Sequence, residues 1–362
     1  MAVPFASPSA TNVFVPRLSD ELFVGFSRNV ADFAVNQYIG IIPVTKPLGF
    51  YLNWDSNQSA RIGPANGSKW TWAPGSDRPT GQDNHSEFSY SKYYAKRLSF
   101  PTILPVEADQ WADFDLGGAE RIKLAQQLMT QRTYAAVNAL VGANYGVGNS
   151  ANVDGVAGPN GAGAAAILAS GQNWSNGTVS QPNIKLSLGR ALLAINKATL
   201  GRLMPQDLTL ILTPDMALAM ALSPEVQDAL KQSQYAMGAL TGDEPNVNGF
   251  FGLPPRLFGV KVVIEQTIMD QTEKGPAAQT LQYVFPTGSA YLVVRAKDLA
   301  QPIMPANGSK PFSTITMFAV EEFTVERQVD TWNRVVKDAI TTYYDMINVA
   351  PQGAFQFTRC LG

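Results

Sequence analysis

Charged side chains are scarce in this chain of 362 residues, which holds 27 Lys and Arg and 29 Asp and Glu. At average usage, a chain of this length carries about 90 charged residues. Neutral polar side chains can cover the remaining surface, and so can contacts with other protein subunits, because interface cores are depleted of charge. The composition therefore indicates a protein that assembles with copies of itself.

Cysteine and histidine are nearly absent. The single cysteine, Cys360, excludes an intrachain disulfide and a cysteine-rich zinc site. The single histidine, His85, lies between Asn84 and Ser86 and follows Asp83, so the residue types of a catalytic triad occur in one segment. Adjacent residues of an extended chain project to alternate sides and cannot form a relay among themselves. We interpret His85 as an exposed loop residue.

Carboxylate pairs are the other possible source of catalysis. Asp113 with Asp115, or Glu321 with Glu322, could be proposed for sugar hydrolysis. We interpret the first pair as acids that lead a helix and the second pair as strand residues on opposite faces. Residues 161–166 match a dinucleotide-binding turn only in part, and no run of oxygen ligands has calcium-loop spacing. The sequence therefore predicts no catalytic, cofactor-binding or metal-binding residue and no enzyme activity.

A basic surface, a secretory signal and a long apolar run are also missing. The formal net charge of -2 argues against broad electrostatic binding to nucleic acid. The first 29 residues lack a basic start followed by an apolar block. The longest apolar run, residues 216–222, is far shorter than the about 20 residues of a membrane helix. We expect a soluble protein made in a cytoplasm, with only weak nucleic-acid contacts.

Aromatic residues are frequent between residues 47 and 101, in runs that alternate as β-strands do. Turn-rich pieces separate these runs, and the whole pattern predicts a long hairpin. An isolated two-stranded ribbon is marginal in water, so we expect its aromatic face to rest on a neighbouring subunit. The alternative is an ordinary edge hairpin folded back on its own domain. The side chains expected at the contact are Trp54, Trp70, Trp72, Phe88, Tyr90 and Tyr94.

The rest of the chain shows a mixture of helical and strand periodicity. The ranges predicted as helices are 20–37, 118–143 and 184–200. Thr213 and Ser223 each precede a proline and an acid, which is typical of a capped helix start. The predicted buried stripe of the second helix contains Ile122, Ala125, Met129, Ala136 and Leu140. The ranges predicted as strands are 208–212, 260–264, 281–285, 291–295 and 315–329.

In this order of elements the sequence resembles the major capsid protein of tailed double-stranded DNA bacteriophages. That fold is shared with herpesvirus capsid floor domains and encapsulins. The segments that carry the resemblance are GGAERIKLAQQLMTQRTYAAVNAL, PQDLTLILTPDMALAMALSPEVQDAL, GFFGLPPRLFGVKVVIEQT and VVKDAITTYYDMINVAP. None of them is an exact motif, because the resemblance lies in order and spacing, and together they cover most of the chain.

The resemblance implies an α+β fold of the tailed-phage capsid type, with an N-terminal arm, an extended loop, a peripheral domain with a spine helix, and an axial domain. The arm would be residues 1–45, and the extended loop, a long β-hairpin, would be residues 46–101. The peripheral domain would be residues 102–200 and the axial domain residues 201–312. Residues 313–362 would return as a strand to the peripheral domain and form the C-terminus.

The resemblance also implies a structural protein that self-assembles into hexamers and pentamers of an icosahedral phage head around double-stranded DNA. The implied partners are copies of itself and scaffolding, portal and decoration proteins, with weak non-specific contact to packaged DNA, no membrane and no cofactor. Its location would be the virion, after assembly in the host cytoplasm. The alternatives are an encapsulin-like compartment shell, a tail or baseplate structural protein, and a carboxylate-dependent glycoside hydrolase.

Overall fold

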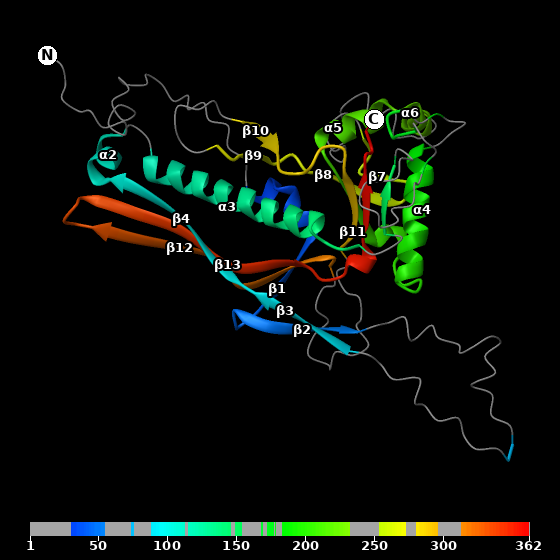
Figure 1. Cartoon of the computed structure of the whole chain (residues 1–362). Helices are drawn as coiled ribbons and strands as arrows, with labels where there is room; N and C mark the ends of the chain where they lie inside the picture. Colours follow the sequence, from blue (N-terminus) through cyan, green and yellow to red (C-terminus); the bar gives the residue numbers. More distant parts are fainter. Residues whose placement is uncertain are drawn as a thin grey trace.

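The structure is a computed structural model whose described residues form two larger β-sheets, of four and six strands, two two-stranded sheets, and helices packed against the larger sheets (Figure 1). The mixed α and β architecture expected from the sequence is confirmed. None of the helices that the structure describes is long and apolar enough to cross a membrane. The residues described are 30–54, 74–75, 88–112, 115–145, 149–153, 168, 172–176, 178, 183–231, 253–272, 280–295 and 313–361.

The first sheet has four strands in the order β1-β12-β13-β4. Strand β1 pairs in parallel with β12, and the other two pairs are antiparallel. Strands β12 and β13 form a long hairpin, which we call the ribbon, and its distal end extends beyond β1 (Figure 1). The bounds are β1 Ile39–Pro43, β4 Lys96–Pro105, β12 Ile315–Asp330 and β13 Val335–Asn348.

The predicted strand 315–329 is therefore confirmed, whereas strand β13 is not predicted from the sequence. Its apolar alternation is interrupted by Lys337, Asp338 and Asp345. Asp338 is buried but has ion-pair partners, since its carboxylate oxygens lie 3.4 Å from Nε of Arg121 and 3.7 Å from Nε of Arg327. Tertiary ion pairs thus allow a charged residue in a strand that sequence periodicity does not reveal.

The spine helix α3, Leu116–Val141, packs against the first sheet and confirms the helix expected at 118–143. Asp115 caps its start by accepting a hydrogen bond of 2.8 Å from the Gly118 amide, as expected for an acid that leads a helix. At 1.5 Å per residue, its 26 residues span about 39 Å. The spine helix is thus long enough to support most of the first sheet (Figure 1).

The buried stripe of α3 differs in part from the predicted one. Ile122 is 54% exposed, while Leu124 and Leu128 are buried. Residues two positions apart lie on nearly opposite sides of a helix, so burial of Leu124 turns Ile122 toward solvent. The prediction for Ile122 is therefore wrong, and Ala125 is only partly buried. The predicted stripe residues that are buried are Met129, Ala136 and Leu140.

The second sheet has six strands in the order β5-β14-β11-β6-β8-β7, and we call it the axial sheet. Both of its faces are covered, because Leu208, Leu210 and Leu212 of β6 pack with α4 and α5 while Ile211 packs with α3. A strand that is buried on both faces is apolar at nearly every position, which explains why residues 208–212 form an almost continuous apolar run. The bounds are β5 Ser150–Asn152, β6 Leu208–Leu212, β7 Arg256–Leu257, β8 Val260–Ile264, β11 Ala290–Val294 and β14 Phe355–Thr358.

Three helices of the axial region confirm their predictions: α4 Asn183–Ala198, α5 Pro214–Leu222 and α6 Pro224–Lys231. The hydroxyl of Thr213 accepts a hydrogen bond of 3.4 Å from the Met216 amide at the start of α5. Glu225 in the first turn of α6 accepts hydrogen bonds from the Ile184 and Lys185 amides, at 2.9 and 2.8 Å. Its buried carboxylate thus caps α4 and joins the two helices.

The smaller elements complete the architecture. Strand β2, Leu48–Trp54, pairs antiparallel with β3, Phe88–Tyr94, and confirms the root of the hairpin expected between residues 47 and 101. Strand β4 follows β3 directly but belongs to the first sheet. The remaining elements are the hairpin β9 Ile268–Asp270 with β10 Leu281–Tyr283, the helix α2 Val106–Trp111, and the 3-10 turns Val30–Asp32, Ala34–Gln37, Pro205–Asp207 and Pro351–Gly353.

Part of the segment expected to be an arm, residues 33–35 and 38–40, is buried in the core. Over residues 30–37 two 3-10 turns take the place of the helix predicted at 20–37, whose earlier residues lie outside the described ones, and Phe33 and Val35 are buried. The Tyr38 hydroxyl donates a hydrogen bond of 3.0 Å to the carboxylate of Glu265, at the end of β8. Burial, and then this carboxylate, raise the pKa of Tyr38 well above its usual value. Residues 33–35 and 38–40 thus pack on their own subunit, and the expectation that the arm crosses onto a neighbouring subunit stays a prediction.

Candidate assembly surface

Hairpin β2–β3 is fixed to the body by its inner face. The ring of Tyr93 stacks on Phe318 of β12 with centroids 4.6 Å apart, and Tyr51 stacks on the same ring at 5.7 Å. A Cβ atom at Gly49 would lie 2.3 Å from the Tyr93 hydroxyl, so only glycine leaves room for that ring. The Tyr94 amide also donates a hydrogen bond of 2.7 Å to Asp345 of β13. The root of the hairpin is therefore held by its own subunit.

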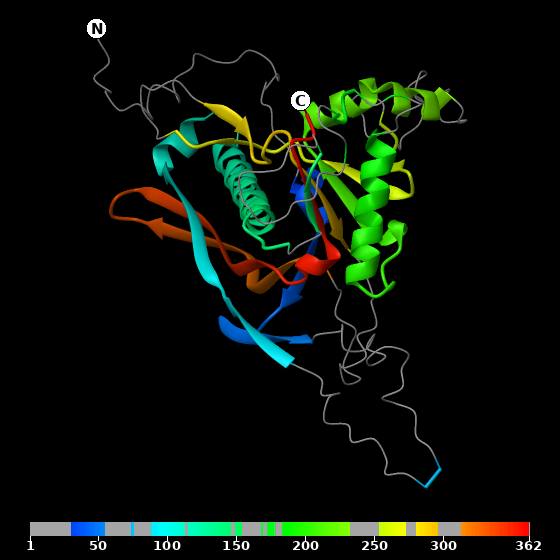
Figure 2. The ribbon, with the colours of Figure 1, turned by 45° about the vertical axis from the view of Figure 1, so that its right-hand side comes forward.

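The outer face of this hairpin is aromatic and uncovered. Tyr90 is 72% exposed and Tyr94 is 60% exposed, and Phe50 is also 60% exposed. The register pairs Tyr94 with Leu48 and Phe50 with Lys92, which puts these side chains on one face. The ammonium of Lys92 lies 5.9 Å from the centre of the Phe50 ring. We call Leu48, Phe50, Tyr90 and Tyr94 the hairpin surface. The backbone of the hairpin, in blue and cyan, lies on the side of the first sheet away from α3 (Figure 2).

Two of the six predicted contact residues, Tyr90 and Tyr94, are thus described and exposed. Trp54 and Phe88 are register partners at the far end of the ladder, and only their backbone is described. Trp70 and Trp72 lie outside the described residues. The expectation that these six side chains meet a neighbouring subunit stays a prediction.

The tip of the ribbon presents the most exposed large apolar side chain that the structure describes, Trp332, at 92%. The turn that carries it is well braced. Asp330 accepts hydrogen bonds of 3.2 Å from the Trp332 and Asn333 amides, and its other oxygen accepts one of 2.8 Å from the Asn333 side chain. The guanidinium of Arg334 lies 2.9 Å from Glu107 at the start of α2. The indole is therefore presented on a structured turn.

Further apolar side chains line the distal ribbon near this turn. In the distal half of β12, residues 321–323 and 325–329 are all exposed, and Val325 and Val329, which are four residues apart, lie on one face of the strand. We call the set, together with Trp332, the ribbon surface: Trp111, Phe323, Val325 and Val329 are between 49% and 60% exposed. Ile103 is 64% exposed but is not part of this set, because its register partner Lys337 faces the opposite side of the sheet from Val325 and Val329. The ribbon surface was not predicted from the sequence. A signal was nevertheless present, because a tryptophan stands in the turn-like segment Asp330–Arg334 between two strand-like runs.

Charges around the ribbon surface are paired within the subunit. The pairs are Arg97 with Glu326 at 3.2 Å, Lys337 with Asp330 at 3.5 Å, Arg327 with Asp338 at 3.7 Å, and Arg334 with Glu107 at 2.9 Å. The pairs other than that of the buried Asp338 are largely exposed, and exposed pairs contribute only about 0.2–1 kcal/mol each to stability. Their equal numbers of each sign leave the surface close to neutral, which suits contact with protein better than contact with a polyanion.

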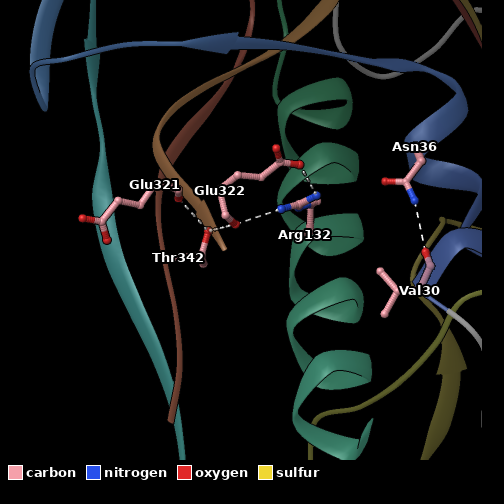
Figure 3. Close-up of polar contacts among 6 residues, drawn as sticks. All are labelled: Val30, Asn36, Arg132, Glu321, Glu322 and Thr342. Carbon is pink, nitrogen blue, oxygen red and sulfur yellow. Dashed lines mark hydrogen bonds and ion pairs between the residues drawn. The ribbon is translucent and has the colours of Figure 1, made fainter. Parts of the chain in front are cut away.

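A buried arginine joins the spine helix to the ribbon (Figure 3). Arg132 of α3 donates a hydrogen bond of 3.2 Å to the Glu322 carbonyl and lies 3.4 Å from its carboxylate. At this point β12 bulges, and the Thr342 hydroxyl donates to the carbonyls of Glu321 and Glu322, at 3.4 and 3.0 Å. A bulge takes backbone N–H and C=O groups out of the hydrogen-bonded ladder, so the side chains of Arg132 and Thr342 bond the freed carbonyls instead.

Figure 3 also shows a contact within the two N-terminal 3-10 turns. The Asn36 side chain donates a hydrogen bond of 3.1 Å to the Val30 carbonyl.

Three of the residues weighed for catalysis are described, and each lies in a structural contact. Asp115 caps α3, and Glu321 and Glu322 belong to the bulge. His85 and Asp113 lie outside the described residues. Within the described part of the chain, no group of three or more His, Cys, Asp or Glu side chains could hold a metal ion. The described arrangement thus offers surfaces for contact, and these are the hairpin surface and the ribbon surface.

Comparisons with known proteins report on the fold. No protein-family model and no curated protein matches the sequence. The structure is similar to a phage-related protein from Bordetella bronchiseptica RB50, with 12% identity, a TM-score of 0.56, and coverage of 91% of this chain and 93% of that chain. It is similar to the mature capsid of bacteriophage PhiM1, with 10% identity, a TM-score of 0.55, and coverage of 94% and 90%.

A third similar structure is the capsid of cyanophage P-SCSP1u. Its identity is 8% and its TM-score 0.56, and the alignment covers 98% of this chain and 99% of that chain. At such low identity the likeness concerns the fold alone, but it extends over almost the entire length of both chains. The fold that the resemblance implied is confirmed: this chain has the fold of phage capsid proteins.

Proposed function

We propose that this chain is a structural major capsid subunit, which self-assembles into hexamers and pentamers of an icosahedral phage head around double-stranded DNA. The observation that carries the proposal is the fold similarity to phage capsids, which covers at least 90% of each compared chain. Exposed apolar surfaces on a braced hairpin and a braced turn support it, because large exposed apolar patches mark protein contacts.

The proposed mechanism is mechanical. The hairpin surface and the ribbon surface contact neighbouring copies, and the spine helix keeps them at a fixed distance. Many contacts of modest strength, repeated around a closed lattice, give a stable shell. In this scheme residues 1–45 are the arm up to its core-bound end, residues 46–101 the extended loop, residues 102–200 with 313–362 the peripheral domain, and residues 201–312 the axial domain. The axial region also takes β5, α4 and β14 from the peripheral ranges, because these elements belong to the axial sheet or pack on it.

The proposed location is the virion, after assembly in the host cytoplasm. Copies of the chain are the main partners, and scaffolding, portal and decoration proteins are further ones. Packaged DNA makes only weak contacts, because the formal net charge is -2 and the ribbon charges are paired. The proposal includes no enzyme activity, cofactor or metal.

The decisive experiment is negative-stain electron microscopy of the purified full chain, with sedimentation velocity on the same sample. The proposal expects closed particles or ring-shaped capsomers. A monodisperse monomer at all concentrations, or a monomer with hydrolytic turnover, would overturn it.

The double substitution of Trp70 and Trp72 by Ser tests the extended loop. It should leave a folded subunit that is defective in assembly, because the contact to the neighbour loses two aromatic anchors. Circular dichroism checks the fold and sedimentation checks assembly. Normal particles from this variant would remove the two tryptophans from the contact.

A further inference from the structure

Helix α4 carries an exposed stripe in which leucine alternates with a basic residue. Leu186 is 42% exposed and Leu193 is 72% exposed, and Arg190 and Lys197 are exposed as well. Their spacing of four, three and four residues places them on one face of the helix. The opposite face is buried through Ile184, Leu188, Ala191 and Ile195. We call this exposed set the α4 stripe.

The charge of this region has one sign. Between residues 183 and 202 the chain holds Lys185, Arg190, Lys197 and Arg202, and no acidic residue. Lys197 in the last turn also complements the helix dipole, which accounts for one charge but not for the exposed leucines. An exposed apolar stripe flanked by charges of one sign favours a partner with apolar groups and the opposite charge.

Helices α5 and α6 offer such a surface on the same chain. On α5, Asp215, Leu218 and Leu222 are exposed at a spacing of three and four residues, and Leu222 is 62% exposed. On α6, Asp228 is half-buried. Residues 213–230 contain no basic residue. We call Asp215, Leu218 and Leu222 of α5, together with Asp228 of the following helix α6, the α5 stripe. Like the α4 stripe it contains two leucines, but its two charged side chains are acidic instead of basic.

The two stripes lie on helices that run crosswise in the axial region (Figures 1 and 2). The two helices share a hydrophobic core, and the contact of Glu225 with the start of α4 fixes α6 against α4. The stripes are therefore two different outward surfaces of one rigid unit. A contact between two different patches of identical chains is head-to-tail, and it generates a ring when the rotation closes.

We infer that the α4 stripe of one copy packs against the α5 stripe of the next copy, in a head-to-tail contact between axial regions. The inference rests on the proposed function only in requiring assembly into rings. The inference specifies which two helix faces meet, and it assigns their relative orientation to the attraction between basic residues of the α4 stripe and acidic residues of the α5 stripe. Nucleic acid is the other ligand that a basic stripe could bind, but the leucines at alternate positions and the complementary acidic stripe favour a second copy.

Paired charge reversals test this contact in the full chain. The variant R190E/K197E makes the α4 stripe acidic, and D215K/D228K makes the α5 stripe basic. Each alone places like charges across every contact, so we expect the assembled fraction at low salt to fall at least tenfold. Salt at 1 M shortens the screening length to about 3 Å and should reduce this loss. The control R256E/K261E makes the same charge change on β7 and β8 and should assemble as wild type.

Mixing separates the contact from misfolding. In an equal mixture of R190E/K197E and D215K/D228K, every contact between unlike chains joins opposite charges, so assembly into six-membered rings, in which the two chains can alternate, should return. The quadruple variant should assemble as well. Variants that assemble normally on their own, or a mixture that fails although both chains are folded by circular dichroism, would overturn the inference while wild-type particles keep the capsid proposal. Normal particles of R190E/K197E that lose bound nucleic acid would also overturn it, by assigning the stripe to that ligand.

Discussion

The axial sheet and the two outlying hairpins, β2–β3 and the distal ribbon, differ in how far their apolar side chains are buried. In the axial sheet every residue of β6 and of β11 is buried, and helices cover both faces. On β2–β3 and the distal ribbon, side chains of the same apolar kind are half to fully exposed. The difference indicates that the axial core stabilises the subunit, whereas the hairpin and ribbon surfaces are available to stabilise contacts between subunits.

The largest effect should come from the axial core. Leu210→Ala removes a fully buried side chain at the centre of the sheet, so we expect a loss of about 2–5 kcal/mol in the free energy of unfolding. Urea unfolding measures it. Ile122→Ala, at a 54% exposed position on α3, is the control and should change the value by under about 0.5 kcal/mol. Equal losses in the free energy of unfolding for the two variants would contradict the claim that the axial core is the main source of subunit stability.

The joint between the spine helix and the ribbon should have the next largest effect. Arg132→Met removes the groups that contact the carbonyl and carboxylate of Glu322, and we expect a loss of about 1–3 kcal/mol. Arg97→Met breaks only the exposed pair with Glu326 and should cost under about 1 kcal/mol. Chemical denaturation compares the two variants, and a larger cost for Arg97→Met would contradict the role of the bulge.

Alkaline pH should weaken the axial core through Tyr291. Burial raises the pKa of this hydroxyl to about 12, although the hydrogen bond from Gln356 acts in the lowering direction. Because folding raises this pKa, the protonated Tyr291 hydroxyl contributes fully to stability below its pKa in the unfolded chain, about 10. That contribution is lost as the pH rises toward 12. We expect the free energy of unfolding to fall there by up to about 1.4 kcal/mol per pH unit. Tyr291→Phe should reduce this slope, and an unchanged slope would refute the assignment.

The smallest effect on subunit stability should come from the exposed surfaces. Trp332→Ser and the double substitution Tyr90→Ser with Tyr94→Ser should each change the free energy of unfolding by under about 0.5 kcal/mol, because these side chains contact little of their own subunit. Assembly measured by sedimentation should nevertheless fall. Trp332→Phe keeps an aromatic ring and should assemble better than Trp332→Ser. A marked loss of stability without loss of assembly would reverse their assignment.

Elements with strong local signals could be predicted from the sequence. The spine helix, β6, the proline-led starts of α5 and α6, and the root of the β2–β3 hairpin have periodicity or capping residues that act locally. The burial of residues 33–35 and 38–40, strand β13 and the bulge of β12 depend on partners far along the chain, such as Glu265 for Tyr38 and Arg132 for Glu322. Periodicity carries no information on such partners.

The candidate surfaces divide in the same way. Tyr90 and Tyr94 were predictable, because alternation in a two-stranded ribbon leaves one face without a core. Trp332 was not recognised, because its exposure depends on the Asp330 turn at the end of two strands that had to be identified first. Ile122 shows the opposite error, since an apolar residue near helical spacing is exposed.

Hydrogen exchange of the assembled and the dissociated chain tests the central claim most directly. The account predicts that amides of residues 48–54, 88–94 and 323–335 become at least tenfold more protected on assembly, whereas those of β6 and β11 are protected in both states. Equal protection of the hairpin and ribbon amides in the two states would contradict the claim that these surfaces are covered by other copies.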